Sequence, residues 1–194
     1  MNRNDLRQQL ERYVPVNEQE EKDLKQILSA LAIDNIFSRE NEIMHMTASA
    51  WVVNRGFTKA LMAYHRIYDS WAWLGGHADG DEDLLAVAMR EVQEESGLRQ
   101  VTPVSRDILS VEILPVSGHE KKGHYVGSHL HLNVTYLLRA DEQEPVRSRE
   151  EENKAVAWFT PAEALAASAE PWFRERIYPK LITGAEQYRK QLSD

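Results

Sequence analysis

Three glutamates and one arginine occupy one short stretch of the chain, REVQEESGL at residues 90–98. If residues 83–95 are helical, Glu91 and Glu95 stand four residues apart on one face, and Glu94 lies beside them. Like charges at these spacings each cost a helix roughly 0.3 kcal/mol, so a compensating cation is expected. Carboxylate oxygens suit Mg²⁺ or Mn²⁺, ions that also bridge to substrate phosphates. The pattern therefore indicates either a metal site for phosphate chemistry or a solvated acidic face.

The elements that must position this helix follow from the periodicity of the flanking sequence. Strands are predicted at residues 45–54, 59–67, 108–116 and 129–138, with a short strand ending at 158. Helices are predicted at residues 4–14, 16–33 and 172–191, the last one broken near Pro179. Strands surround the acidic helix and helices flank both ends, which predicts an α+β or layered α/β/α domain.

Composition limits the classes of function. The 194 residues fit one domain of ordinary size, and a formal net charge of −8 argues against a broad nucleic-acid-binding face. The sequence has no cysteine, which excludes disulfides, thiolate metal sites and cysteine nucleophiles. The amino terminus lacks a secretory signal pattern, and no apolar run is long enough to span a membrane. We therefore expect a cytoplasmic protein that binds neither a nucleic acid polymer nor a membrane.

The sequence around the acidic helix resembles the Nudix box. The matching positions, nine over 23 residues without a gap, are Gly76, Glu82, Arg90, Glu91, Val92, Glu94, Glu95, Gly97 and Leu98. One departure is Leu74, which stands before the paired glycines where many family members have proline. This departure bears on the shape of the loop and not on the metal site. The chain is thus identified as similar to the Nudix hydrolases.

The resemblance implies a fold and a division of the chain. The fold is of the α+β class, an α/β/α sandwich with a mixed central sheet, in which the box forms a loop, a helix and a loop. The Nudix hydrolase domain with its C-terminal helices is expected over residues 43–194. Residues 1–42 are not explained by the resemblance and are expected to form a helical N-terminal extension that packs on the core or on a partner.

The resemblance also implies a reaction. Nudix hydrolases cleave a phosphoanhydride bond in a nucleoside diphosphate linked to another moiety, by attack of water on phosphorus with Mg²⁺ or Mn²⁺ as cofactor. By position, the metal ligands are Glu91, Glu94, Glu95 and the backbone carbonyl of Gly76. The partner would be a small nucleoside diphosphate derivative, and a homodimer is among the expectations because family members are often dimers. The expected enzyme is a metal-dependent pyrophosphatase acting on acid anhydrides.

The resemblance also implies a role for Arg90, and it leaves the general base open. Arg90 is expected to brace the site with Glu82 as its partner. The general base is either Glu94 or Glu152, since family members use different glutamates, and a polar turn is the competing interpretation for Glu152. The alternative function is a non-catalytic Nudix-like nucleotide-binding sensor or regulator, but the intact box glutamates favour an enzyme.

Substrate contacts lie outside the box, where the signal is weaker. His129, His131 and Asn133 alternate along one face of a strand and could read a base or a sugar, and Arg66 could bind a phosphate. The competing interpretation is a solvated strand face and a surface arginine. A second candidate metal cluster, formed by His77, Asp79 and Asp81, is better explained by helix capping or solvation.

Overall fold

Two short helices open the chain. In the computed structural model they are α1 (Arg3–Arg12) and α2 (Glu18–Ala30), capped by Asn2 and Asn17, whose side chains accept hydrogen bonds from backbone N–H groups of the first turn. Their apolar sides are buried in the same core as the sheet, through Leu6, Leu10, Leu24 and Ile27. The residues that the structure describes are 1–66, 69–121, 123–149 and 153–192.

Within the described residues, seven strands form one mixed sheet around β1 (Met44–Asn54). The others are β2 (Ala60–His65), β3 (Ser70–Ala72), β4 (Leu74–His77), β5 (Val101–Val116), β8 (His129–Ala140) and β9 (Asn153–Phe159). The order is β3-β2-β1-β8-β5, with β4 also paired to β1 and β9 to β2. β1 runs parallel to β8, and the other pairings are antiparallel.

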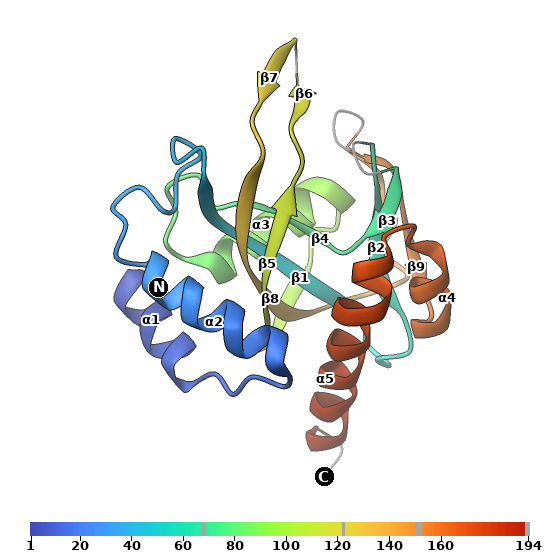
Figure 1. The fold of residues 1–194 in the computed structure, drawn as a ribbon. Helices are drawn as coiled ribbons and strands as arrows, with labels where there is room; N and C mark the ends of the chain where they lie inside the picture. Colours follow the sequence, from blue (N-terminus) through green and yellow to red (C-terminus); the bar gives the residue numbers. More distant parts are fainter. Residues whose placement is uncertain (67–68, 122, 150–152, 193–194) are drawn as a thin grey trace.

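Helices cover both faces of this sheet (Figure 1). On one face, α3 (Leu84–Ser96) joins α1 and α2 in a core that includes Met46, Ala48 and Ala50 of β1. On the other face, α4 (Pro161–Ala167) and α5 (Tyr178–Gln191) pack against Trp51 and Val53 of the same strand. The alternation of side chains along β1 thus serves two cores. The predicted α+β sandwich with a mixed central sheet is confirmed.

The last helical region is irregular, as the sequence indicated. A π-helical turn (Phe173–Ile177) comes immediately before α5, and Pro179 lies in the first turn of α5. Proline cannot donate the backbone hydrogen bond of a regular helix, so an irregular turn beside it is expected. The described residues contain no helix that is both long and apolar enough to cross a membrane.

Three strand features were not predicted from the sequence. Strands β3 and β4 lie where no strand was expected, and β5 begins at Val101, ahead of the expected start at Ile108. Residues 117–128, where no strand was predicted, include a two-stranded hairpin of β6 (His119–Lys121) and β7 (His124–Val126) that projects from the domain (Figure 1). Strand β4 contains two glycines, which have low strand propensity, and forms because β1 offers it a partner.

Candidate functional site

Helix α3 presents the predicted metal ligands in three different environments. Asp83 caps the helix by accepting a hydrogen bond of 3.1 Å from Ala86 N–H. The apolar stripe of the helix is buried, and Glu95 lies at its edge with only 2% of its surface exposed. Glu91 is half-buried and Glu94 is exposed. The solvent exposure of the three carboxylates on this helix therefore increases from Glu95 through Glu91 to Glu94.

Two glycines bring strand β4 against this helix. A Cβ at position 76 would overlap the carboxyl group of Glu91, and a Cβ at position 75 would overlap Ser49. Gly75 N–H donates a hydrogen bond of 3.1 Å to Glu95 Oε2. Position 75 approaches the backbone of β1 too closely for any side chain, and a side chain at position 76 would displace the Glu91 carboxyl group, so these two glycines and the two carboxylates occupy one small region.

His65, at the end of β2, approaches the same region. Its Nε2 atom lies 4.0 Å from Glu95 Oε1. Burial lowers the pKa of His65 to about 4, so its ring is neutral near pH 7 and this contact is dipolar rather than ionic. Sequence analysis did not single out His65, because it precedes Glu95 by thirty residues and only the folded sheet brings the two side chains together.

Arg149 binds the outermost box glutamate. Its Nη1 atom donates a hydrogen bond of 2.8 Å to Glu94 Oε2, and both side chains are substantially exposed. The backbone N–H of Arg147 donates to Ser96 O at 2.8 Å, which fixes this segment against the C-terminal end of α3. Arg149 was not foreseen as a site residue. Glu152, the other candidate general base, lies outside the described residues.

The expected pairing of Arg90 with Glu82 is replaced by two other pairs. Arg90 Nη1 lies 3.3 Å from Asp81 Oδ2. Glu82 accepts a hydrogen bond of 2.9 Å from the backbone N–H of Arg3, and the Arg3 guanidinium lies 3.3 Å from its other oxygen. The correction has a simple cause: helix α1 packs beside the box loop and supplies a nearer cation. A residue of the N-terminal helices thus holds a box residue.

The side-chain amide of Asn133 is buried and forms its hydrogen bonds with other side chains of the protein. It is 1% exposed, and its Nδ2 atom donates to Glu112 Oε2 at 2.9 Å and to Thr135 Oγ1 at 3.1 Å. Its Oδ1 atom accepts hydrogen bonds from the hydroxyl groups of Thr47 and Ser49 at 3.0 and 2.8 Å. The geometry gives Asn133 a structural position in place of the substrate contact expected from the sequence.

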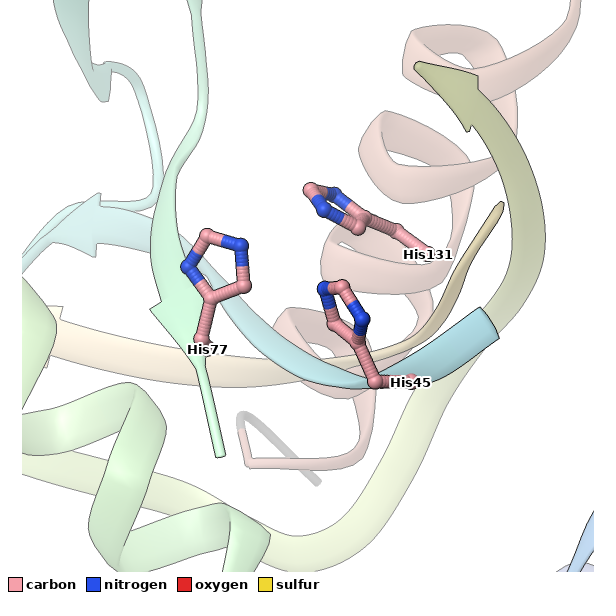
Figure 2. Close-up of side chains that lie close together, drawn as sticks. All are labelled: His45, His77 and His131. Carbon is pink, nitrogen blue, oxygen red and sulfur yellow. The ribbon is translucent and has the colours of Figure 1, made fainter. Parts of the chain in front are cut away.

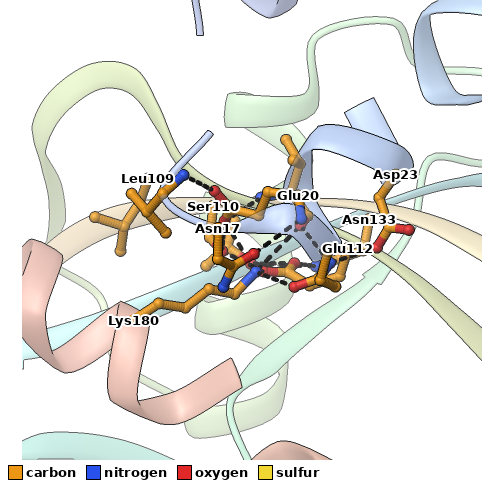
Figure 3. A network of polar contacts seen from close by, with 12 residues as sticks. Asn17, Glu20, Asp23, Leu109, Ser110, Glu112, Asn133 and Lys180 are labelled. Carbon is orange, nitrogen blue, oxygen red and sulfur yellow. Dashed lines mark hydrogen bonds and ion pairs between the residues drawn. The ribbon is translucent and has the colours of Figure 1, made fainter. Parts of the chain in front are cut away.

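The amide belongs to a larger polar network that links three parts of the chain (Figure 3). Lys180 on α5 lies 2.9 Å from Glu20 Oε1 on α2 and 2.9 Å from Glu112 Oε1 on β5. Both carboxylates are fully buried. Burial raises the pKa of Glu20, but the charge of Lys180 and hydrogen bonds from Val16 N–H, Lys180 and Tyr13 more than offset it, so the net pKa is lowered.

The two histidines predicted to contact substrate lie in a group of four. His129 and His131 on β8 meet His45 on β1 and His77 on β4. Figure 2 shows the rings of three of them converging from three strands. Arg66 follows His65 at the end of β2 and is exposed.

The second cluster considered from the sequence does not form. Asp79 makes two hydrogen bonds of 2.6 Å with Arg39, and Asp81 accepts from Arg90. His77 instead faces His45 and His131. The aspartates are bound by Arg39, which precedes β1, and by Arg90 on α3, while the alternation of β4 directs His77 to the other histidines.

The box residues fit a hard divalent cation. The glycine at position 76 leaves space directly against the Glu91 carboxyl group, and Glu95 lies beside the neighbouring backbone. Among the described residues, the three potential ligand atoms found within 4.8 Å of one another belong to His45, His77 and His131 and not to the box glutamates. The third box glutamate, Glu94, is bound by Arg149.

Comparison with protein-family models identifies the family of this chain. The model described as NUDIX domain matches residues 44–181, most of the chain. The chain belongs to the NUDIX domain family. Membership places the glutamates of α3 in a pyrophosphohydrolase, and the chain is an enzyme of that type. This confirms the resemblance found in the sequence.

Comparison with solved structures shows the Nudix fold. The crystal structure of a C. elegans Ap4A hydrolase binary complex has a TM-score of 0.54 at 18% identity, covering 75% of this chain and 98% of that one. The structure of the E. coli dihydroneopterin triphosphate pyrophosphohydrolase has a TM-score of 0.52 at 17% identity, covering 71% and 95%. A search of curated proteins finds no match to this Nudix chain.

Proposed function

We propose that this Nudix protein hydrolyses a phosphoanhydride bond in a nucleoside diphosphate linked to another moiety, with Mg²⁺ or Mn²⁺ as cofactor. The observation that carries the proposal is the packing of Gly76 against Glu91 beside the Gly75–Glu95 hydrogen bond. It gathers two carboxylates and unhindered backbone in one place. Such a set suits a hard cation that also holds phosphate oxygens.

The protein's own residues divide the work around that centre. Glu91, Glu94, Glu95 and the carbonyl of Gly76 would hold the cation, which when bound supplies charge neutralisation for the phosphates and a more acidic water. The Gly75–Glu95 hydrogen bond keeps one carboxylate oriented. Arg66, which is exposed and follows His65 directly after the end of β2, is the predicted phosphate contact. Neutral His65 beside Glu95 adds no positive charge that would compete with the cation.

Glu94 is our proposed general base. It is exposed, so it can reach a solvent water, and its hydrogen bond with Arg149 is a surface contact that contributes at most about 1 kcal/mol. Exchange of this partner for water is therefore inexpensive. Glu152 remains the second candidate, and comparing the two substitutions decides between them.

A panel of substrates tests the function. It contains nucleotide sugars, ADP-ribose, dinucleoside polyphosphates, and normal and oxidised nucleoside triphosphates. Dinucleoside polyphosphates and triphosphates are included because two proteins with this fold are an Ap4A hydrolase and a dihydroneopterin triphosphate pyrophosphohydrolase. Release of nucleoside monophosphate, pyrophosphate or phosphate is measured with Mg²⁺ and with Mn²⁺. We expect metal-dependent turnover of at least one compound that EDTA abolishes.

Matched variants assign the roles. Glu94→Gln is expected to lower kcat roughly 10³-fold if Glu94 is the base, and Glu152→Gln to lower it by less than tenfold. Glu186→Gln on α5 removes the same charge from an exposed position and serves as the control. Tight nucleotide binding without turnover of any compound would instead indicate a nucleotide-binding sensor. We further propose a cytoplasmic setting, which the cysteine-free sequence supports.

A further inference from the structure

Three neighbouring strands each direct a histidine to the same place. β4, β1 and β8 are adjacent at this end of the sheet, and His45 pairs with His131 across the parallel strands. His77 pairs with Thr47, two residues from His45, so all three rings project from one face of the sheet. One nitrogen from each ring lies within 4.8 Å of the others (Figure 2). The register of the sheet thus assembles nitrogen ligands with no carboxylate among them.

The backbone fixes which nitrogen of two rings faces the group. His45 Nδ1 lies 3.0 Å from Asn41 O, and His129 Nδ1 lies 2.8 Å from Gly127 O. A carbonyl only accepts, so each Nδ1 carries the proton and each Nε2 presents a lone pair. This is the arrangement in which proteins hold histidine ligands of metals. It leaves Nε2 of both rings in the form that binds a cation.

One of these lone pairs is buried without a partner. His45 is 4% exposed, and its Nε2 atom has no hydrogen-bond partner within the described part of the chain. A buried polar atom that makes no hydrogen bond costs stability, so such an atom calls for an explanation. A metal ion at the centre of the group would satisfy it. His77 and His131 are only half-buried, which gives an ion access from solvent.

We propose that His45, His77 and His131 form a binding site for a zinc-class transition-metal ion, separate from the box glutamates, with His129 beside them as the fourth nitrogen. Tetrahedral zinc at about 2.0–2.1 Å from each nitrogen requires nitrogens about 3.4 Å apart. Side-chain rotations that move the nitrogen atoms by about 1 Å bring them to that separation. His129 Nε2 already lies 3.1 Å from His131 Nε2.

The chemistry of the donors separates this site from the Mg²⁺ site. Imidazole nitrogen suits Zn²⁺, Cu²⁺, Ni²⁺ and Fe²⁺, whereas carboxylate and carbonyl oxygen suit Mg²⁺ and Mn²⁺. Burial and the neighbouring histidines lower the pKa of His131 to about 2, and burial lowers the pKa of His45, so both stay neutral and able to bind. The ion would tie together the ends of three strands and fix His77, the residue that follows Gly76.

Zinc binding is measured on the full chain, prepared without a polyhistidine tag and stripped with EDTA. Zn²⁺ is added in the presence of a large excess of Mg²⁺, and bound metal is counted by mass spectrometry after gel filtration. We expect one Zn²⁺ per chain. Gln replaces histidine in the three test variants His45→Gln, His77→Gln and His131→Gln, in which the Zn²⁺ retained per chain should fall at least tenfold. His124→Gln, an exposed histidine of β7, is the matched control and should bind as the wild type does.

Two further measurements keep the outcome clear. Glu91→Gln should retain the Zn²⁺, and its loss there would place the ion at the box and overturn the proposal. X-ray absorption of the zinc-loaded wild-type protein should show imidazole nitrogens at about 2.0 Å, a result that does not depend on any variant folding. Carboxylate oxygens in that shell, or stoichiometry unchanged in all three histidine variants, would also overturn it.

Discussion

Glu20 and Glu112 are fully buried around the ammonium group of Lys180, whereas the box glutamates on α3 lie from the edge of the core out to solvent. The first group finds its cation within the chain. In the second group, Glu94 meets Arg149 only at the surface. The contrast follows from solvation, because a buried carboxylate is stable only with a permanent partner, while a carboxylate near solvent can exchange partners.

The difference separates structural charge from functional charge within one small protein. Lys180 joins α5, β5 and α2, and so ties the N-terminal helices to the sheet (Figure 3). Of the box glutamates, Glu94 is bound by Arg149 at the surface and Glu95 accepts a hydrogen bond from the backbone of β4, and we propose that they accept a cation that comes and goes with substrate. Substitutions should therefore affect stability in the first group and turnover in the second.

The largest effect is expected on turnover. Glu91→Gln and Glu95→Gln should each lower kcat roughly 10³-fold, because each removes a charged ligand from the proposed metal centre. Rates are measured at saturating Mg²⁺ with the best compound of the panel, and thermal melting verifies that each variant is folded. Glu186→Gln is the control. Activity near that of the wild type in both variants would show that the box glutamates do not form the active site.

Lys180→Met tests the buried group. Removing the ammonium leaves two buried carboxylates without their cation, and we expect the free energy of unfolding to fall by about 3–5 kcal/mol. Urea denaturation at neutral pH measures the change. Lys190→Met, at an exposed position of the same helix, should alter stability by no more than about 0.5 kcal/mol. Equal effects of the two substitutions would contradict a structural role for Lys180.

Gly76→Ala tests the packing of β4 on the box helix. The added Cβ would overlap the Glu91 carboxyl group, displace it, and lower kcat about 10²-fold. Gly127→Ala is the matched control, since a Cβ there meets nothing within 4 Å. Full activity in Gly76→Ala would show that Glu91 does not need its present position.

The pH dependence of stability that Glu20 contributes should have opposite signs in the wild type and in Lys180→Met. In the wild type the folded-state pKa of Glu20 is lowered below the ordinary 4.5, so its contribution is present above pH 4.5 and is lost as the pH falls through the lowered value. Lys180→Met removes the charge and the hydrogen bond of Lys180 and leaves only the hydrogen bonds from Val16 N–H and Tyr13 against the effect of burial, so we expect the pKa of Glu20 to rise. Denaturation between pH 7 and pH 5 should then show stability rising toward acid in the variant, and a variant that loses stability over that range would contradict this assignment.

The smallest effect is expected at the link between α1 and the box loop. Arg3→Ala removes a partly exposed ion pair with Glu82 and exposed hydrogen bonds from the guanidinium to the carbonyls of Ile33 and Asp34, but leaves the backbone hydrogen bond to Glu82 in place. We expect at most about 1 kcal/mol of stability and less than a tenfold change in kcat. Lys22→Ala, in an exposed ion pair on α2, is the comparison. A loss of activity as large as that of Glu91→Gln would make Arg3 part of the active site.

Much of the fold and part of the site could be predicted from local pattern. The helix of the box and the strand predicted at 129–138 follow from spacing within single elements. Strand β4 could not be predicted, because its glycines carry no strand signal and its pairing with β1 supplies the order. The partner of Glu82 was missed for a similar reason, since Arg3 lies in another helix.

The sequence by itself determined that Glu91, Glu94 and Glu95 share one side of a helix, because helical geometry fixes the relation of residues three and four positions apart. It also determined the family, since the box is contiguous. Only the tertiary structure decided that Asn133 is enclosed by Glu112 and that His45, His77 and His131 meet. These neighbours are set by strand register, and register depends on the packing of the whole sheet rather than on any local stretch of sequence.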